Sequence, residues 1–171
     1  MITIVPWEKR ANQAFTLGYK YESEFHGCGQ CVVAATSEAL GIFNDQVFKS
    51  ATGLCGGIGL DTNNTCSAFS GGVLVLGMVI GRRREQFDDD RENKYLNFKL
   101  VQKLQQRFED KYCTTNCRKI HKKLFGREFD MRLKEERVAF EAAGGHGTNG
   151  CSLVVANASR WVVEIIAETF T

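Results

Sequence analysis

The sequence predicts an all-α fold, a compact single-domain bundle of about seven or eight helices joined by loops rich in glycine and asparagine. Three observations support this prediction. Apolar residues recur with helical spacing through nearly all of the 171 residues, and no segment alternates as a confident β-strand. One proline against 17 glycines suits helices separated by tight turns. With 43% hydrophobic and 25% charged residues, the chain has the composition of a globular domain with its own core.

Local signals bound the first three predicted helices. A helix over about residues 7–21 begins after Pro6, a residue suited to helix starts. A second helix, over about residues 28–40, ends at Gly41, which can adopt the left-handed conformation that closes helices. A third follows Asn44, a good N-cap, and ends near Gly53. Residues 53–65 are then predicted to form a loop.

The apolar stretch at residues 68–81 predicts a buried core helix that begins at about Cys66. Crossing a bilayer takes roughly 20 residues, so this stretch is too short, and no membrane association is expected. Its glycines, Gly71, Gly72 and Gly77, would let neighbouring backbones approach closely. Any exposed part of this helix is a candidate surface for a homodimer.

Residues 81–94 are predicted to form a solvated charged connector, because they contain blocks of like charge at 82–84 and 88–90. A basic docking site for an acidic partner is the alternative interpretation. Residues 95–112 then give the clearest amphipathic helix of the chain. Its apolar face consists of Leu96, Leu100, Val101, Leu104 and Phe108.

Three further helices are predicted after that one. A short helix follows Asn116, another covers residues 134–143, and the last starts near Cys151. The apolar face of the last helix consists of Val154, Ala158, Trp161, Val162 and Ile165. Residues 1–171 as a whole are expected to be one cysteine-rich helical domain.

Charge and cysteine content narrow the function classes. With 22 Lys and Arg against 20 Asp and Glu, the net charge of +2 argues against a nucleic-acid binder driven by bulk basicity. The first residues have neither a basic region nor a long apolar run, so a cytoplasmic location is expected. In that reducing compartment, cysteines more often bind metals or carry out redox chemistry than form structural disulfides. The number of cysteines, seven, also rules out complete internal pairing.

Four cysteines stand at predicted helix starts, each after a loop of glycine, asparagine or threonine: Cys28, Cys66, Cys117 and Cys151. A helix start presents unpaired N–H groups and a partial positive charge, and both stabilise an anion. A thiol there is expected to have a lowered pKa and to bind metal or attack a disulfide readily. If the four starts converge, they form a site for an anionic metal–thiolate cluster, whose reduction potential such N–H groups raise.

The other three cysteines are possible additional ligands, although packing as a small hydrophobe is the more ordinary role for each. Cys28 and Cys31 form a C-x-x-C pair, which permits a redox disulfide or metal chelation but lacks the βαβ context of thioredoxin-like proteins. Cys31 lies nearly one turn into its helix, and Cys55 lies in the glycine-rich loop. Cys113 precedes Cys117 by four residues, and the polar residues between them are expected to interrupt the helix.

Histidines and a glycine motif add weaker signals. His26 and His146 are close enough in sequence to the cysteines to reach the same site, where His can replace Cys at iron, although ordinary loop or surface positions are the default expectation. His121 lies one turn after Cys117, and a solvent-facing position among lysines is equally expected. Residues 145–150 match G-x-G-x-x-G, but a helix is predicted before them instead of a strand, so no nucleotide is expected. No hydrolase constellation is present in the sequence.

The order and spacing of these motifs resemble the C-GCAxxG-C-C family of redox-active proteins over about residues 25–168. The matching segments are residues 28–32 (CGQCV), 53–59 (GLCGGIG), 66–72 (CSAFSGG), 115–118 (TNCR) and 150–151 (GC). That family is similar to the C-terminal part of split-Soret cytochromes, which bind an iron–sulfur cluster beside haems. The resemblance implies Cys28, Cys66, Cys117 and Cys151 as the cluster ligands. The haem attachment segment of those cytochromes is missing here, so no haem is implied.

The chain departs from the family pattern at four positions. Ser67 replaces the motif glycine after the central cysteine, and Cys31, Cys55 and Cys113 are extra cysteines. The extra cysteines leave the cluster type open between [2Fe-2S] and [4Fe-4S] and allow a larger or a second cluster.

The sequence therefore favours an iron–sulfur protein of an anaerobic or low-oxygen metabolism that works in electron transfer or redox chemistry with a redox partner protein. If the protein is an enzyme, it is expected to be an oxidoreductase. A second interpretation is a metal-free thiol–disulfide oxidoreductase using Cys28 and Cys31. A third is a structural zinc site in an interaction protein, since four thiolates suit Zn²⁺. The wide separation of the four cysteines in sequence is unlike the short paired knuckles of such zinc sites.

Overall fold

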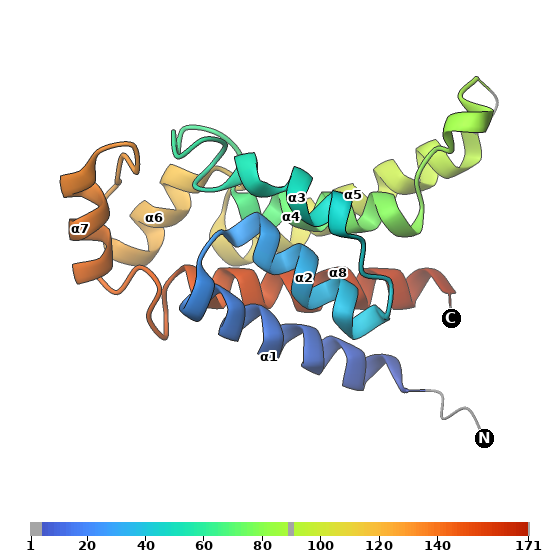
Figure 1. The fold of residues 1–171 in the computed structure, drawn as a ribbon, viewed down its shortest axis with the longest axis horizontal. Helices are drawn as coiled ribbons and strands as arrows, with labels where there is room; N and C mark the ends of the chain where they lie inside the picture. The colour runs from blue at the N-terminus through green and yellow to red at the C-terminus, as the bar shows by residue number, and fades with distance from the viewer. Residues whose placement is uncertain (1–4, 89–90, 171) are drawn as a thin grey trace.

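The computed structural model describes residues 5–88 and 91–170, and it confirms the predicted all-α bundle (Figure 1). The helices are α1 (Trp7–Phe25), α2 (Cys28–Leu40), α3 (Asp45–Ser50), α4 (Ser67–Val79), α5 (Arg91–Tyr112), α6 (Cys117–Phe125), α7 (Lys134–Ala142) and α8 (Cys151–Phe170). Two short 3-10 helices, η1 (Thr52–Leu54) and η2 (Arg84–Gln86), lie between them. In the described ranges the extended backbone pairs only in an isolated bridge between Thr65 and Asn116.

Three predicted boundaries differ from the structure. Helix α1 continues to Phe25, one turn beyond the predicted end, because the helical face continues to a buried Glu22. Helix α3 ends at Ser50, and the backbone tightens into η1 before the glycine-rich loop. Helix α5 starts at Arg91, so the charged connector ends earlier than residue 94; residues 89 and 90 of that connector lie outside the described part.

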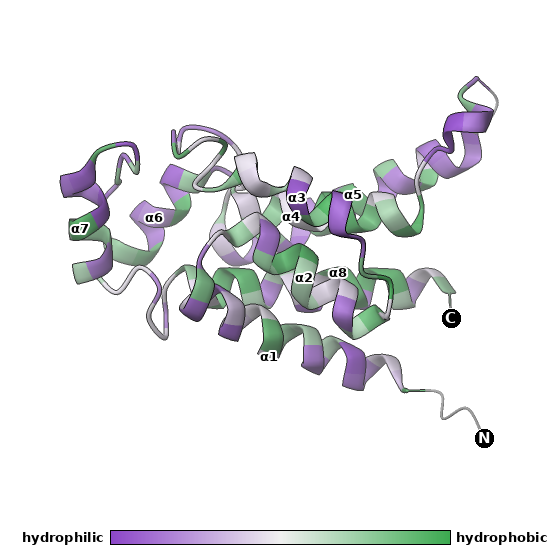
Figure 2. Ribbon diagram, in the orientation of Figure 1, coloured by the Kyte–Doolittle hydropathy of each residue, from purple (hydrophilic) through white to green (hydrophobic). Residues whose placement is uncertain are grey.

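Helix α8 is the central element of the bundle. It packs against α1, α2, α4 and α5, and the side chains of its inner face, such as Val155, Ala158 and Val162, are fully buried. The hydropathy colouring separates this apolar core from the polar outer faces of α1 and α5 (Figure 2). Within the described residues, no helix is both long enough and apolar enough to cross a membrane.

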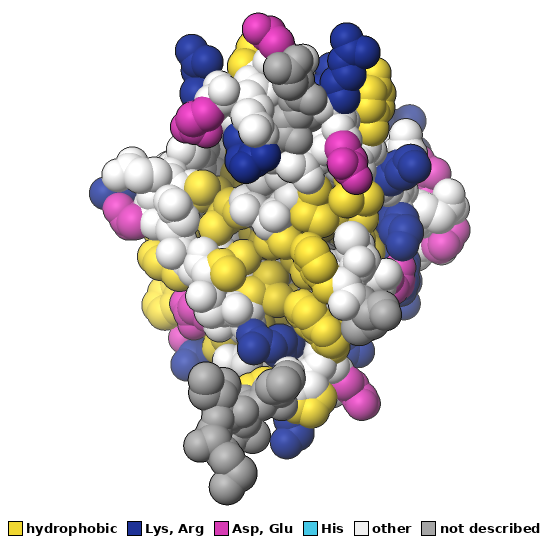
Figure 3. All heavy atoms as spheres, turned by 90° about the vertical axis from the view of Figure 1, so that its right-hand side faces the viewer, with side chains coloured by type: hydrophobic (Ala, Val, Ile, Leu, Met, Phe, Trp, Pro, Cys, Tyr) yellow, Lys and Arg dark blue, Asp and Glu magenta, His cyan; other side chains and the backbone are white. Residues whose placement is uncertain are grey.

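The two ends of the bundle differ. Helices α2 and α8 both begin at the end where α6 and α7 lie, whereas the start of α1 and the end of α8 lie at the opposite end (Figure 1). Figure 3 shows apolar side chains gathered on the surface at that opposite end. The homodimer suggested by the sequence stays a prediction.

Helices α2 and α4 cross at two glycines, which confirms that residues 68–81 contain a core helix with close backbone contacts. A Cβ atom added to Gly71 would lie 2.5 Å from the carbonyl oxygen of Gly29 and 3.0 Å from its Cα atom. Both obstacles are backbone atoms of α2, so a side chain could enter only if the two helices moved apart. On the same helix, a Cβ atom added to Gly77 would meet nothing within 4 Å.

Gly71 and Gly77, both on α4, give a matched pair of variants. We expect Gly71→Ala to destabilise the protein by about 1–3 kcal/mol, the usual cost of overpacking a core contact. We expect Gly77→Ala to be stabilising by about 0.5–1 kcal/mol, because alanine loses less backbone entropy in a helix. Urea unfolding followed by circular dichroism would measure both changes. Equal stability of the two variants would contradict this account of the α2–α4 crossing.

Candidate metal centre

Two loops that are distant in sequence pair at the starts of α4 and α6. The N–H of Cys66 donates to the carbonyl oxygen of Thr115 at 2.7 Å, and the N–H of Cys117 donates to that of Asn64 at 2.9 Å. Asn116 caps α6 by accepting a hydrogen bond from the N–H of Lys119. This pairing places Cys66, the N-cap of α4, beside Cys117, the first residue of α6.

Turns rich in glycine position the other two helix-start cysteines. Gly27 has a φ of +90° and directs the chain from α1 into α2, whose first residue is Cys28. The N–H of Cys151, the first residue of α8, donates to the carbonyl oxygen of Gly145 at 2.7 Å. The predicted placement of all four cysteines at helix starts is therefore confirmed to within one residue.

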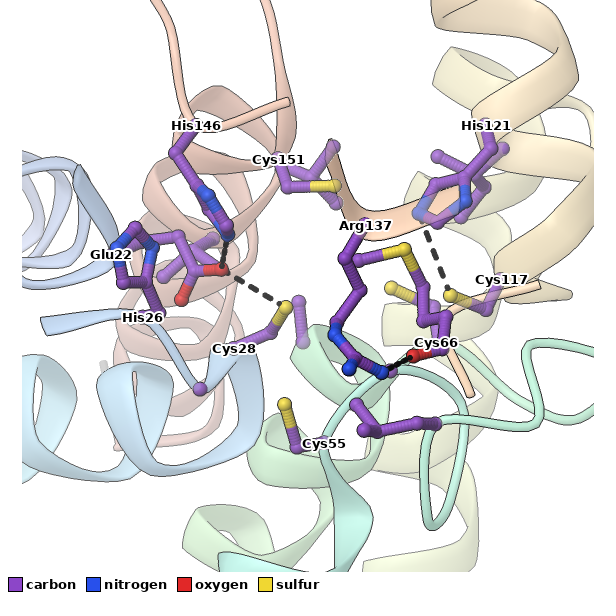
Figure 4. A pocket seen from close by; sticks show the side chains of 18 of the residues that line it. Glu22, His26, Cys28, Cys55, Cys66, Cys117, His121, Arg137, His146 and Cys151 are labelled. Atoms are coloured by element: carbon purple, nitrogen blue, oxygen red, sulfur yellow. Dashed lines mark hydrogen bonds and ion pairs between the residues drawn. The ribbon is translucent and has the colours of Figure 1, made fainter. Parts of the chain in front are cut away.

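The four helix-start cysteines line one cavity of about 200 Å³, together with Cys55 (Figure 4). Cys66, Cys117 and Cys151 are buried, and Cys28 and Cys55 are partly buried. Apolar side chains make up much of the remaining wall: Leu60, Ala68, Ile120, Met131, Val154 and Val155. The five thiols thus come from five separate segments and share one largely apolar cavity.

Cys55 reaches the cavity on an unusual loop. Residues 56–60 all have positive φ angles between 59° and 74°, including the non-glycine residues Ile58 and Leu60. Glycine adopts this left-handed conformation without steric cost, whereas a β-branched residue such as isoleucine rarely does. Gly57 is also needed for space, because a Cβ atom there would lie 2.8 Å from the Cβ atom of Cys117.

Ser67 holds this loop against the start of α4. Its hydroxyl group donates to the carbonyl oxygen of Leu54 and accepts a hydrogen bond from the N–H of Gly57 at 3.1 Å. Ser67 is fully buried, so both contacts are shielded from water. Ser67 therefore ties the Cys55 loop to the helix that follows Cys66.

The other two extra cysteines do not line the cavity. The thiol of Cys31 is buried and donates to the carbonyl oxygen of His26 at 3.1 Å. Cys113 is exposed, with a φ of +63° that ends α5, and its sulfur lies 3.1 Å from the Nζ atom of Lys123. The predicted break between Cys113 and Cys117 is confirmed, and of the three extra cysteines only Cys55 lines this cavity.

Glu22 is a cavity residue that the sequence reasoning missed. Its side chain is fully buried at the end of α1, where Oε1 accepts a hydrogen bond from the thiol of Cys28 at 3.1 Å and Oε2 has no partner. Burial raises the pKa of Glu22 to about 7, and thiol hydrogen bonds offset only part of this shift. The sequence carries a signal for this position, since Glu22 continues the helical face of small residues formed by Ala11, Ala14 and Gly18.

The histidines occupy three different environments. His121 is buried, and its Nε2 atom lies 3.7 Å from the sulfur of Cys117; the alternative of a solvent-facing position is wrong. Burial lowers the pKa of His121 to about 4, so the ring is neutral at pH 7. His146 is half-buried at the cavity, and His26 is an exposed residue that also lines it.

The expectation that helix starts lower the thiol pKa values is wrong for the metal-free chain. Burial raises the pKa of Cys66 to about 11, although the N–H groups of Ala68 and Phe69 act in the opposite direction. Burial and the neighbouring thiols also raise the pKa values of Cys28, Cys117 and Cys151. Desolvation outweighs the helix N-terminus here, so forming the thiolates requires a compensating positive charge in the cavity.

A cluster of aromatic rings packs between α6 and α7, next to the cavity residues His121 and Cys151. Phe125, Phe129 and Phe140 pack edge to face with centroids 5.5–5.8 Å apart, and the ring of His121 joins them. Arg137 of α7 lines the cavity and is anchored by donating to the carbonyl oxygen of Met131 at 2.8 Å. This end of the molecule therefore combines an aromatic cluster with a positive charge at the cavity.

The fold and the site define a class, an all-α protein in which cysteines at helix starts line one cavity. The chain belongs to the C_GCAxxG_C_C family: the family model described as "Putative redox-active protein (C_GCAxxG_C_C)" matches residues 26–165. This match confirms the resemblance seen in the sequence. No curated protein and no solved structure compared with the chain gives a significant match. The similarity to split-Soret cytochromes stays a prediction.

The Ser67 contacts can be tested by removing one hydroxyl group. In Ser67→Ala, the N–H of Gly57 loses its buried acceptor, which should destabilise the protein by about 1–3 kcal/mol. Amide hydrogen exchange should also accelerate within residues 53–62. Ser70→Ala, three residues along the same helix, should have a smaller effect because its hydroxyl group makes only a 3.4 Å contact with the carbonyl oxygen of Cys66. Unchanged exchange in the loop of Ser67→Ala would contradict this role.

Proposed function

We propose that the cavity binds an iron–sulfur cluster through Cys28, Cys66, Cys117 and Cys151, and that the protein is a cytoplasmic redox or electron-transfer protein with a protein redox partner. The observation that carries the proposal is the convergence of these four thiols, from four helix starts, on one cavity. The donor set fits the group, because Cys thiolates are the usual ligands of iron–sulfur clusters. A bound cluster would supply a centre that exchanges electrons.

The size of the cavity favours a polynuclear centre over the structural zinc alternative. A cavity volume of about 10–15 Å³ holds one water molecule, whereas this cavity has a volume of about 200 Å³. A single Zn²⁺ ion with four sulfur ligands, each about 2.3 Å away, would need the thiols to close in around one point. A centre of several metal ions fits thiols that stand around a larger space.

The protein residues would stabilise the thiolates and exclude water. The N–H groups of Ala68 and Phe69 point at the sulfur of Cys66, and such contacts favour the anionic form. The positive charge of Arg118 favours the thiolate of Cys117 in the same way. The aromatic cluster of α6 and α7 packs against Cys151 and would lower the local dielectric constant there, which sets the reduction potential together with the hydrogen bonds to sulfur.

The metal-free thiol–disulfide alternative receives less support from the structure. An attacking thiol must be partly ionised and accessible, and the buried thiol of Cys31 is neither. The pKa of Cys31 is raised by burial and by the nearby carboxylate of Glu22. Cys28 faces the cavity, where its thiol donates to Glu22.

The proposal is tested by purifying the protein anaerobically. We expect a brown sample with bound iron and acid-labile sulfide, a visible absorption spectrum that bleaches on reduction, and an electron paramagnetic resonance signal in one redox state. Cys66→Ser should lose most of the iron, because a serine oxygen is a poorer ligand for iron than a thiolate. Cys113→Ser, at an exposed position outside the cavity, should retain it. A colourless, iron-free and sulfide-free wild-type sample would refute the proposal.

Cys55 decides whether the site uses four or five thiolates. With Cys28, Cys66, Cys117 and Cys151 as the ligands, Cys55→Ala should keep at least half of the wild-type iron and the same electron paramagnetic resonance line shape. Cys31→Ala is the matched control, because that thiol lies outside the cavity. If Cys55→Ala loses as much iron as Cys66→Ala while Cys31→Ala loses none, the four-ligand assignment is wrong and a larger cluster is indicated.

A further inference from the structure

Three side chains at the edge of the thiol cavity bring nitrogen and oxygen ligands together. His26, Glu141 and His146 each offer one ligand atom, and these three atoms lie within 4.8 Å of one another. The Nδ1 atom of His146 lies 2.6 Å from Oε1 of Glu141, and the rings of His26 and His146 have centroids 3.8 Å apart. The three residues come from the end of α1, the end of α7 and the loop before α8.

The backbone holds both histidines in place before any ion arrives. His26 is the C-cap of α1 with a φ of +60°, and its N–H donates to the carbonyl oxygen of Glu22 at 3.3 Å. The carbonyl oxygen of His146 accepts a hydrogen bond from the hydroxyl group of Ser152 at 2.8 Å. A non-glycine residue held at positive φ is a strained feature of the kind that clusters at functional sites.

Glu22 supplies an independent observation that points to a cation. Its Oε1 atom lies 3.5 Å from the Nε2 atom of His146 (Figure 4), whereas Glu141 contacts the other ring nitrogen, Nδ1. The fully buried Oε2 atom of Glu22 has no partner. A metal-bound histidine usually donates its second ring N–H to a carboxylate, which fixes the ring and strengthens the ligand. With Nδ1 as the ligand atom, the Nε2 atom of His146 faces Glu22, and a small shift from 3.5 Å would complete such a hydrogen bond.

We propose that His26, His146 and Glu141 bind one divalent transition-metal ion, Zn²⁺ or Fe²⁺, at a second site separate from the thiol ligands. Two histidines and one carboxylate are a ligand set for both metals, and they leave coordination positions open. Ligands about 2.1 Å from an ion lie at most about 4.2 Å apart, so binding needs the 2.6 Å contact between His146 and Glu141 to open slightly and any wider pair to close slightly. The Glu141 side chain is 53% exposed, which gives the ion a path from solvent.

The second site lies next to the thiols of the first site. All three ligands line the same cavity as the five thiols. Glu22 lies between the two sets, because its Oε1 atom contacts both the thiol of Cys28 and the ring of His146. An ion held there would present its open positions to a small molecule that enters the cavity, and its charge would offset that of nearby thiolates.

The test is a titration of the anaerobically purified protein with Zn²⁺ and, for spectra, with Co²⁺. Calorimetry should show one Zn²⁺ ion bound per chain at this site. Co²⁺ at this site should give weak ligand-field bands without intense sulfur-to-cobalt charge-transfer bands, which separates it from Co²⁺ in the thiol cavity. Glu141→Gln, His26→Ala and His146→Ala should each weaken this binding at least about tenfold, in line with the cost of disturbing metal sites.

Glu135→Gln is the matched control, since it removes a carboxylate from the first turn of the same helix α7. It should leave the affinity unchanged. The exposed position of Glu141 keeps Glu141→Gln informative even if a histidine variant folds poorly. Unchanged affinity in Glu141→Gln would overturn the proposal, and so would loss of the iron–sulfur spectrum in His26→Ala or His146→Ala, because the histidines would then serve the cluster. If the anaerobically purified wild-type protein holds no cluster but binds one Zn²⁺ ion that Glu141→Gln weakens, this site is supported and the proposed function is refuted.

Discussion

Placing five thiols and a carboxyl group around one cavity is the physical constraint on which the rest of this structure depends. Burial raises the pKa of Glu22 to about 7 and raises the pKa values of all five thiols, so the charged forms of these groups are disfavoured. Positive charge in the cavity would favour the thiolates, and in the proposed function metal ions supply it. In that proposal the helix starts and the arginines add to the stabilisation of the thiolates.

The architecture meets this constraint by aligning helix starts from distant parts of the chain. Backbone pairing between residues 62–66 and 115–118 joins the starts of α4 and α6, and the close crossing at Gly71 brings α2 against α4. Helix α8 then carries Cys151 to the same end of the bundle that holds α6 and α7 (Figure 1). The fold thus brings cysteines that are far apart in the sequence to one cavity.

The cavity also shows how one hydroxyl group can hold a loop in an uncommon conformation. Ser67 ties down the left-handed loop that presents Cys55, by accepting a hydrogen bond from the N–H of Gly57 and donating to the carbonyl oxygen of Leu54. At the same cavity, Glu22 contacts both the thiol of Cys28 and the ring of His146, so nitrogen, oxygen and sulfur atoms lie next to one another.

The sequence by itself determined the helical class, most helix limits and the position of four cysteines at helix starts, because periodicity, caps and glycine turns are local signals. Tertiary structure decided which side chains meet. It placed Cys55 in the lining of the cavity but not Cys31 or Cys113. It also buried His121 against Cys117 instead of leaving it among lysines on the surface. It also reversed the expected direction of the thiol pKa shifts, since desolvation depends on how several helices pack around a sulfur and not on one helix start.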